Sequence, residues 1–167
     1  YFKASSQVRR DFAAVNERLI GPVPLYVTLF GRGEGAFREP ANLRKLEALQ
    51  RELERLSGVS AAVSMADPLR LLNRALERGD PTQERIPDSR EEVSDLVFMV
   101  PKAELRRFAN SNHSAANVLV RTGELGSRAV RTLVARIEAV VERLALEPAL
   151  RVEVTGTARA GILRFTF

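Results

Sequence analysis

The chain has 167 residues, of which 45% are hydrophobic and 28% charged, a composition that predicts a globular domain with one sizeable core and excludes intrinsic disorder. It has no cysteine, which excludes disulfides and thiolate metal sites, and no apolar run near the roughly 20 residues that span a bilayer. A net charge of +5 is compatible with binding to nucleic acid or to an anionic membrane surface. However, most arginines alternate with glutamates along helical segments, which is typical of a solvated face.

An amphipathic helix is predicted first, over Ser6–Ile20, within an N-terminal segment 1–22. Its apolar residues recur at spacings of four, three and four, and the stripe consists of Val8, Phe12, Val15 and Leu19. Gly21-Pro22 is a natural stop for this helix.

Residues 23–66 then predict a strand, a helix and a strand. Leu25, Val27 and Leu29 alternate with less apolar residues, as do Val59, Ala61 and Val63, so each run has one buried face. The intervening helix is predicted over Pro40–Ser57, inside which the leucine stripe is Leu43, Leu46, Leu49, Leu53 and Leu56. Gly31–Gly35 precedes it, but this run lacks the glycine spacing and the lysine of a phosphate-binding loop, which favours a mobile connector.

The insertion 67–114 is too long to be a simple loop. Asp67-Pro68 predicts the cap and first turn of a short helix that stops at Gly79. Ser89 to Glu92 is a capping box that opens a second helix, and Pro101–Ala109 predicts a further helical turn or two.

Residues 115–158 repeat the first pattern 91 positions later. Ala116, Val118 and Val120 alternate, a broad amphipathic helix is predicted over Ser127–Ala145, and alternation resumes at Leu150, Val152 and Val154. Two such halves predict an α+β fold of the ferredoxin-like βαββαβ class, with a four-stranded antiparallel sheet, strands near 24–30, 59–65, 116–122 and 150–156, and helices on one face.

Few residues predict chemistry. His113, the only histidine, has no second histidine or cysteine to share a metal and is expected in an exposed turn. Asp88, Glu91 and Glu92 have the composition of an acid and base pair, but helix capping explains them with fewer assumptions. The central strands carry no aromatic side chain for base stacking, which argues against RNA recognition. We therefore expect no catalytic residue, no metal, no cofactor and no nucleic-acid partner.

Several local patterns together resemble a known family. They are Val8 to Phe12 leading to Leu19 to Leu25, Gly58-Val59 after a leucine-rich helix, Asp67-Pro68-Leu69 to Asn73, Ile86-Pro87, and Val154-Thr155-Gly156-Thr157-Ala158. Their order and spacing resemble the first extracytoplasmic loop of RND superfamily exporters, in the branch with the MMPL, Patched and hopanoid-transporter-like proteins.

The resemblance implies a periplasmic or extracellular domain of a polytopic cytoplasmic-membrane protein, driven by protons, that moves hydrophobic or lipid-like cargo. We then expect the chain to be a segment of a larger protein, with residues 159–167 leading back to the membrane. The proton-relay residues of that family belong to transmembrane helices outside this sequence. The trimer-docking hairpin of multidrug pumps is not present, which leaves a homo-oligomer open.

In such a porter domain the insertion helices are the candidate walls of a cargo groove. The substrate-contact candidates are Leu72, Leu76, Val93 and Val97, although the same positions also fit an ordinary core. The alternative from a different class is a soluble ferredoxin-like module that binds a small ligand or a protein and regulates its partner.

Overall fold

The computed structural model describes residues 2–18, 25–123, 125–146, 148–158 and 161–166. In order the elements are α1 (Phe2–Glu17), β1 (Leu25–Phe30), the 3-10 turn η1 (Ala36–Arg38), α2 (Pro40–Glu54), β2 (Val59–Val63), α3 (Ala66–Leu76), the 3-10 turn η2 (Pro81–Gln83), α4 (Arg90–Met99), α5 (Lys102–Leu105), β3 (Ala115–Thr122), α6 (Ser127–Leu144), β4 (Arg151–Ala158) and β5 (Gly161–Thr166). The α+β class predicted from the sequence is confirmed.

All these strands belong to one antiparallel sheet with the order β2-β3-β1-β4-β5. The first strands of the two halves, β1 and β3, pair at its centre with Leu25 opposite Val120. Strand β4 flanks β1 and β2 flanks β3, so each half is split by a strand of the other. The prediction that the four repeated strands share one sheet is therefore confirmed.

A fifth strand extends this sheet beyond the prediction. Strand β5 pairs with β4 in an antiparallel hairpin whose register runs from Glu153 opposite Thr166 to Ala158 opposite Gly161. Residues 159–167 were expected to lead back to the membrane, whereas Gly161–Thr166 lies along the edge of the sheet.

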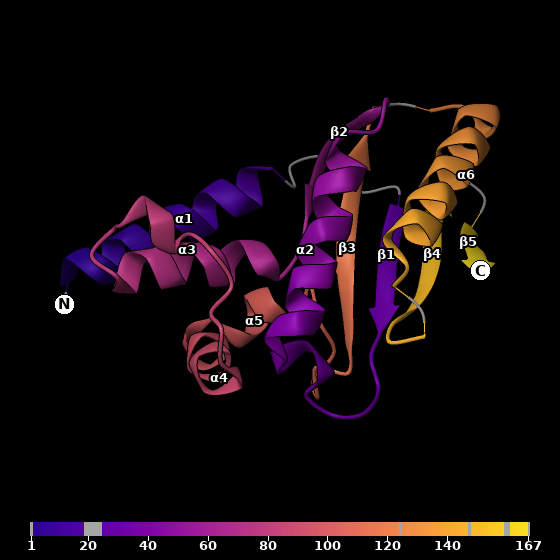
Figure 1. Ribbon diagram of the computed structural model, residues 1–167. Coiled ribbons are helices and arrows are strands. Elements are labelled where there is room, and N and C mark those ends of the chain that lie inside the picture. Colours follow the sequence, from indigo (N-terminus) through magenta and orange to yellow (C-terminus); the bar gives the residue numbers. More distant parts are fainter. Residues whose placement is uncertain (1, 19–24, 124, 147, 159–160, 167) are drawn as a thin grey trace.

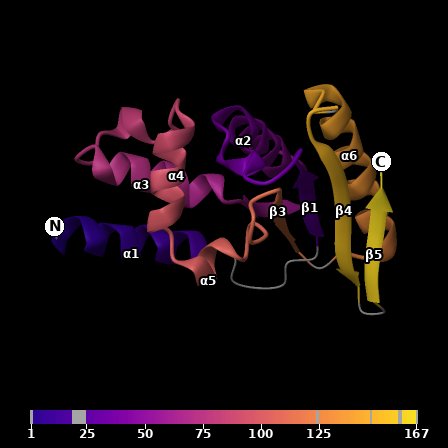
Figure 2. The same ribbon diagram turned by 90° about the horizontal axis from the view of Figure 1, so that it is seen from below.

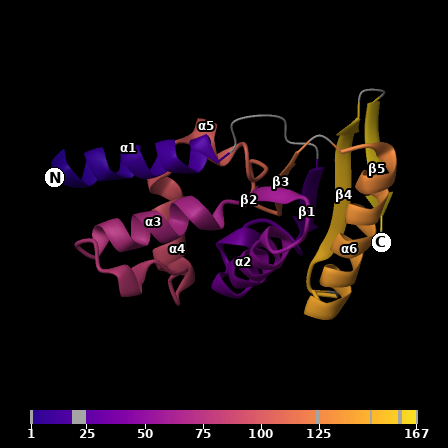
Figure 3. The same cartoon turned by 90° about the horizontal axis from the view of Figure 1, so that it is seen from above.

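Helices α2 and α6 cover one face of the sheet, as Figures 1, 2 and 3 show from three sides. Their leucine and valine stripes are buried against the alternating residues of β1, β3 and β4, and Arg143 of α6 pairs with Glu52 of α2. The buried residues that meet there include Leu25, Val27, Leu29, Leu43, Leu46, Leu49, Leu53, Val118, Val120, Leu133, Val134, Ile137, Val140, Val152 and Val154. Burial of this continuous apolar surface is the main stabilisation of the scaffold.

Helices α1, α3, α4 and α5 gather beyond the β2 edge of the sheet (Figures 1 and 2). Helix α1 begins at Phe2 rather than Ser6, and the predicted stop at Gly21-Pro22 lies outside the described residues. Helix α3 begins at Ala66, so Asp67 lies in its first turn and is not the N-cap. The capping box of α4 is confirmed, since Ser89 Oγ accepts from the Glu92 amide and Glu92 accepts from the Ser89 amide.

Candidate functional site

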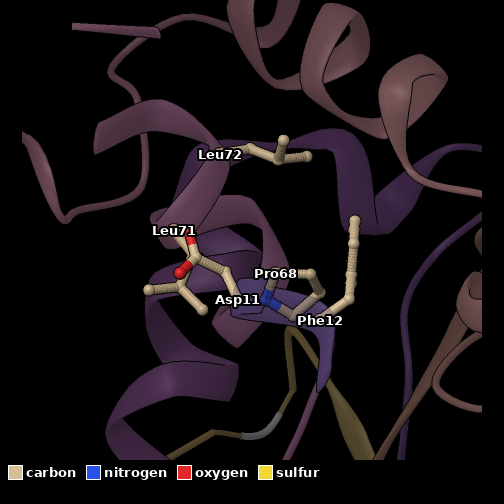
Figure 4. A pocket seen from close by; sticks show the side chains of 5 residues that line it. All are labelled: Asp11, Phe12, Pro68, Leu71 and Leu72. Atoms are coloured by element: carbon tan, nitrogen blue, oxygen red, sulfur yellow. The ribbon is translucent and has the colours of Figure 1, made fainter. Parts of the chain in front are cut away.

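A small apolar hollow lies between α1 and α3, and Figure 4 shows the side chains around it. It is lined by Asp11, Phe12, Pro68, Leu71 and Leu72, whose side chains pack so closely that no room is left for a water molecule. Drug-sized ligands occupy pockets of about 300–1,000 Å³, so this hollow is a closed apolar seam between two helices in this structure and not an open ligand pocket.

The sequence builds the hollow from two helix faces. Phe12 and Val15 lie one turn apart on α1, so both point to the same side of that helix and pack on the core. Helix α3 contributes Pro68 in its first turn and Leu72 one turn later. Asp11 is kept at the rim, where its carboxylate accepts from the Gln7 amide at 2.8 Å.

A buried polar cluster lies at the N-terminal end of α3, where that helix meets α2 and the end of β2. We define it as the Asp67 cluster: Arg18, Gln50, Ser64, Asp67 and Arg70. Asp67 is only 2% exposed, and its Oδ2 accepts from the Ser64 amide at 2.9 Å and from Gln50 Nε2 at 2.8 Å. Ser64 Oγ donates to Gln50 Oε1, and Gln50 Nε2 also reaches the carbonyl of residue 62 at 3.1 Å.

Two arginines neutralise the buried carboxylate. Arg70 Nη2 lies 3.0 Å from Asp67 Oδ1 and Arg18 Nη1 lies 3.6 Å from it. Arg70 also pairs with Glu47 on α2 at 3.1 Å, and Arg18 pairs with Glu54. Because a buried charge is tolerated only when it is paired and hydrogen-bonded, the cluster fixes α1 and α3 to α2 with a defined geometry.

The four predicted contact residues lie in different environments. Leu72 is buried and borders the hollow. Leu76 is 49% exposed at the end of α3. Val93 and Val97 of α4 belong to the core cluster and do not line the hollow. The structure thus brings one of the four to a pocket.

The sequence did not point to Asp11, Phe12, Pro68 or Leu71 as a lining. The stripe of α1 did predict that this helix packs on something, but a helix stripe does not say which element it meets. Only the position of α1 against α3 makes Phe12 a pocket residue.

His113 is the clearest correction. It was expected in an exposed turn, yet it is 7% exposed, with a left-handed backbone at φ 55°. Arg38 Nε donates to its Nδ1 at 3.1 Å. Burial first, and then the nearby Arg38 charge, lower the pKa of His113 below its usual value.

The Gly31–Gly35 segment is another correction, because it is fixed in place rather than free. The amide of Gly31 donates to the Ser114 carbonyl and that of Gly35 to the Asn112 carbonyl, both at 2.8 Å. A Cβ on Gly31 would lie 2.3 Å from the Cβ of Ala36. The loop therefore extends the sheet pairing past the end of β1.

An open polar groove of about 480 Å³ lies beside this loop. It is lined by Arg32, Glu34, Ala36, Glu39, Asn42, Arg90, Pro148 and Ala149. Arg90 pairs with Glu39, and Arg32 Nη2 donates to the Pro148 carbonyl at 3.3 Å. Charges of both signs lie in this groove, so it has no strong preference for an anion or a cation.

Three further carboxylates serve the fold. Asp88 pairs with Arg44 and Arg85, Glu92 caps α4, and Asp80 caps η2. Hydrogen bonds from Thr82 to Asp80 lower the pKa of that carboxyl. Among the residues that the structure describes, no three histidines or carboxylates cluster as a metal site would need.

Within the same described ranges, no helix combines the length and the apolar character required to cross a membrane. Comparison of the chain with known protein families, with curated proteins and with solved structures found no match.

Proposed function

We propose that this chain is an extracytoplasmic porter domain of a proton-driven RND-type exporter that moves hydrophobic or lipid-like cargo. The proposal rests on the sequence resemblance together with one structural observation. The helical insertion follows β2 in a sheet where β3 lies between β1 and β2, and β1 lies between β3 and β4. Read from its β4 side, the order of the four repeated strands is 4-1-3-2, which supports assigning the sheet to the ferredoxin-like class.

The hollow between α1 and α3 gives this proposal a cargo contact. Its lining is apolar apart from Asp11 at the rim, and because the side chains leave no open volume, a hydrocarbon chain enters only when α1 moves away from α3. Leu72 is the predicted contact that remains in place, and Phe12 and Leu71 join it. The domain has no step of bond chemistry in this scheme, because its role is to hold and guide the cargo while the rest of the polytopic protein supplies the energy.

Site-specific photocrosslinking in the full-length protein tests this role. A photoreactive amino acid replaces Leu71, which lines the hollow and is half-buried, and the control replaces Ala135, which is exposed on α6. We expect lipid adducts at position 71 under turnover and few at position 135, as measured by mass spectrometry of the labelled peptide. Absence of adducts at position 71 while transport proceeds would contradict the proposal.

A soluble ligand-binding regulatory module is the second candidate, and the polar groove next to Arg32 favours it. That groove has the volume of a small-molecule site, and charged side chains of both signs line it. The reading frame on either side of the 167 residues separates the two candidates. Apolar segments of about 20 residues on both sides favour the exporter, whereas polar linkers or a second soluble domain favour the module.

A further inference from the structure

Two large apolar side chains project from the end of α4 into solvent. Phe98 is 91% exposed and Met99 45% exposed, whereas Val97 and Val100 on either side of them are buried. Single exposed apolar residues are common in folded proteins, but an adjacent aromatic and methionine at a helix end form a projecting apolar tip.

Cationic residues follow this tip directly. Lys102, Arg106 and Arg107 are exposed, and the acid between them, Glu104, is half-buried and lies 3.5 Å from Arg107. We define the basic tip as Phe98–Arg107. Its exposed side chains are therefore apolar or cationic, apart from the Glu104 that already has a partner.

Most exposed acids of α4 lie away from the basic tip. Glu91 and Glu92 lie in the first turn, at the opposite end of the helix, whereas the exposed Asp95 lies one turn before Phe98. Of these acids Asp95 alone is close to the tip, where Lys102, Arg106 and Arg107 outnumber it.

Helix α1 adds charge of the same sign on the same side of the molecule. Figures 2 and 3 both show α1 and α5 beyond the β2 edge of the sheet, displaced to the side away from α2. Arg9 and Arg10 of α1 are exposed, with Glu17 as the exposed acid near the end of that helix. The cations of α1 and of the basic tip thus exceed the exposed acids on these two segments.

We propose that the basic tip is a contact site for an anionic lipid bilayer. Phe98 and Met99 enter the headgroup region, where aromatic side chains are favoured, and Lys102, Arg106 and Arg107 lie against the lipid phosphates. This inference stands on the exposed residues alone and does not rest on the proposed exporter function.

The shape of the tip favours a bilayer over a folded protein partner. A stable protein interface covers about 800 Å² on each side, far more than two projecting side chains supply. A bilayer accepts shallow insertion of one or two such side chains and holds nearby cations by charge.

A tryptophan placed at the tip reports insertion directly, because the chain has no tryptophan of its own. The Phe98→Trp variant is mixed with vesicles of phosphatidylcholine alone or with about 30% phosphatidylglycerol, which supplies the anionic surface charge. We expect a blue shift and quenching by brominated lipids with the anionic vesicles only. The control is Leu76→Trp, at an exposed apolar site on α3, which should show neither. Absence of a shift in the Phe98→Trp variant, or an equal shift in the Leu76→Trp variant, would overturn the proposal.

Charge neutralisation provides an independent readout by vesicle sedimentation. We expect Lys102→Gln with Arg106→Gln to weaken binding to the anionic vesicles by about fivefold for each residue. The matched control, Arg128→Gln with Arg136→Gln on α6, has the same net charge and should bind within about twofold of the starting chain. Equal weakening by both pairs of substitutions, or no vesicle binding by the starting chain, would refute a lipid contact at the basic tip. Unchanged thermal unfolding of every variant shows that the fold is retained.

Discussion

Two parts of this molecule differ in how much polar contact supports their packing. The repeated scaffold of β1 to β4, α2 and α6 is stabilised by regular apolar stripes that meet in one core. The region of α1 and α3 shares that core through Val15, Leu69 and Leu72, and the Asp67 cluster adds polar contacts between separate segments of the chain. Regular packing tolerates gradual change, whereas a buried ionic junction fails when one partner is lost.

Removal of the buried carboxylate should have the largest effect. Asp67→Ala leaves Arg70, Gln50 and the Ser64 amide without their shared acceptor, so we expect a loss of about 3–5 kcal/mol in the free energy of unfolding. Chemical denaturation measures it. Asp88→Ala is the control, because that exposed pair contributes at most about 1 kcal/mol. Similar losses for both variants would show that burial does not matter here.

A cavity in the scaffold should cost somewhat less. Leu46→Ala truncates a fully buried side chain of α2 and should lower the free energy of unfolding by about 3 kcal/mol.

Hydrogen exchange compares the two variants region by region. Asp67→Ala should speed amide exchange in α3 more than in β1 and β3, whereas Leu46→Ala should speed it in β1 and β3 as strongly as in α3. Uniform acceleration in both variants would mean that the two parts unfold as one unit.

The close approach in the loop after β1 should be next in size. Gly31→Ala puts a methyl group against the Cβ of Ala36 and should cost about 1–3 kcal/mol. Adding Ala36→Gly should recover most of that loss, which makes the pair a test of the contact itself. Gly123→Ala, with open space around the new methyl group, should be close to neutral.

Loss of a helix cap should have a smaller effect. Ser89→Ala removes the hydroxyl that accepts from the Glu92 amide, and we expect about 1 kcal/mol of destabilisation. Thermal unfolding at neutral pH measures it, with the half-buried Ser94→Ala within α4 as the control for the loss of a hydroxyl. A neutral Ser89→Ala variant would argue that α4 is held by its core contacts alone.

The smallest expected effect depends on pH. The folded state of His113 has a lowered pKa, so the unfolded chain binds its proton first as the pH falls. His113 therefore costs no stability above its unfolded pKa, near 6.5, and the free energy of unfolding declines as the pH falls from there toward the folded pKa. His113→Asn keeps a residue that tolerates φ 55° and should flatten this part of the stability profile. A proton NMR titration of the single imidazole checks the direction of the shift.

The scaffold was the predictable part of the fold. Strands such as Leu25–Phe30 and the stripe of α2 follow from periodicity that any half-buried element must show. Strand β5 was missed because Gly161–Thr166 is an edge strand that pairs with β4 alone, and no second copy of it occurs in the repeat to indicate it. At the hollow, Leu72 was singled out from the sequence and its role as a cargo contact stays a prediction, whereas Phe12 and Leu71 were not identified.

The polar residues were harder for a physical reason. Asp67 has the sequence context of an ordinary helix cap, and His113 that of an exposed turn. What buries them is distant in sequence: Arg18 and Gln50 for Asp67, and Arg38 for His113. A single sequence contains no period that links such partners.

The interleaving of the two halves determines how this chain folds. Among the described residues, neither repeated half contains a pair of hydrogen-bonded strands of its own, since β1 lies between β3 and β4, and β2 pairs with β3. Val27 must find Val118 across the whole insertion before the central ladder exists. Contacts of such long sequence separation slow folding, so helices α2 and α6 are expected to form early and the sheet late. The same arrangement means that two fragments cut within the insertion, for instance after Gly79, should remain unfolded separately and fold when they are mixed.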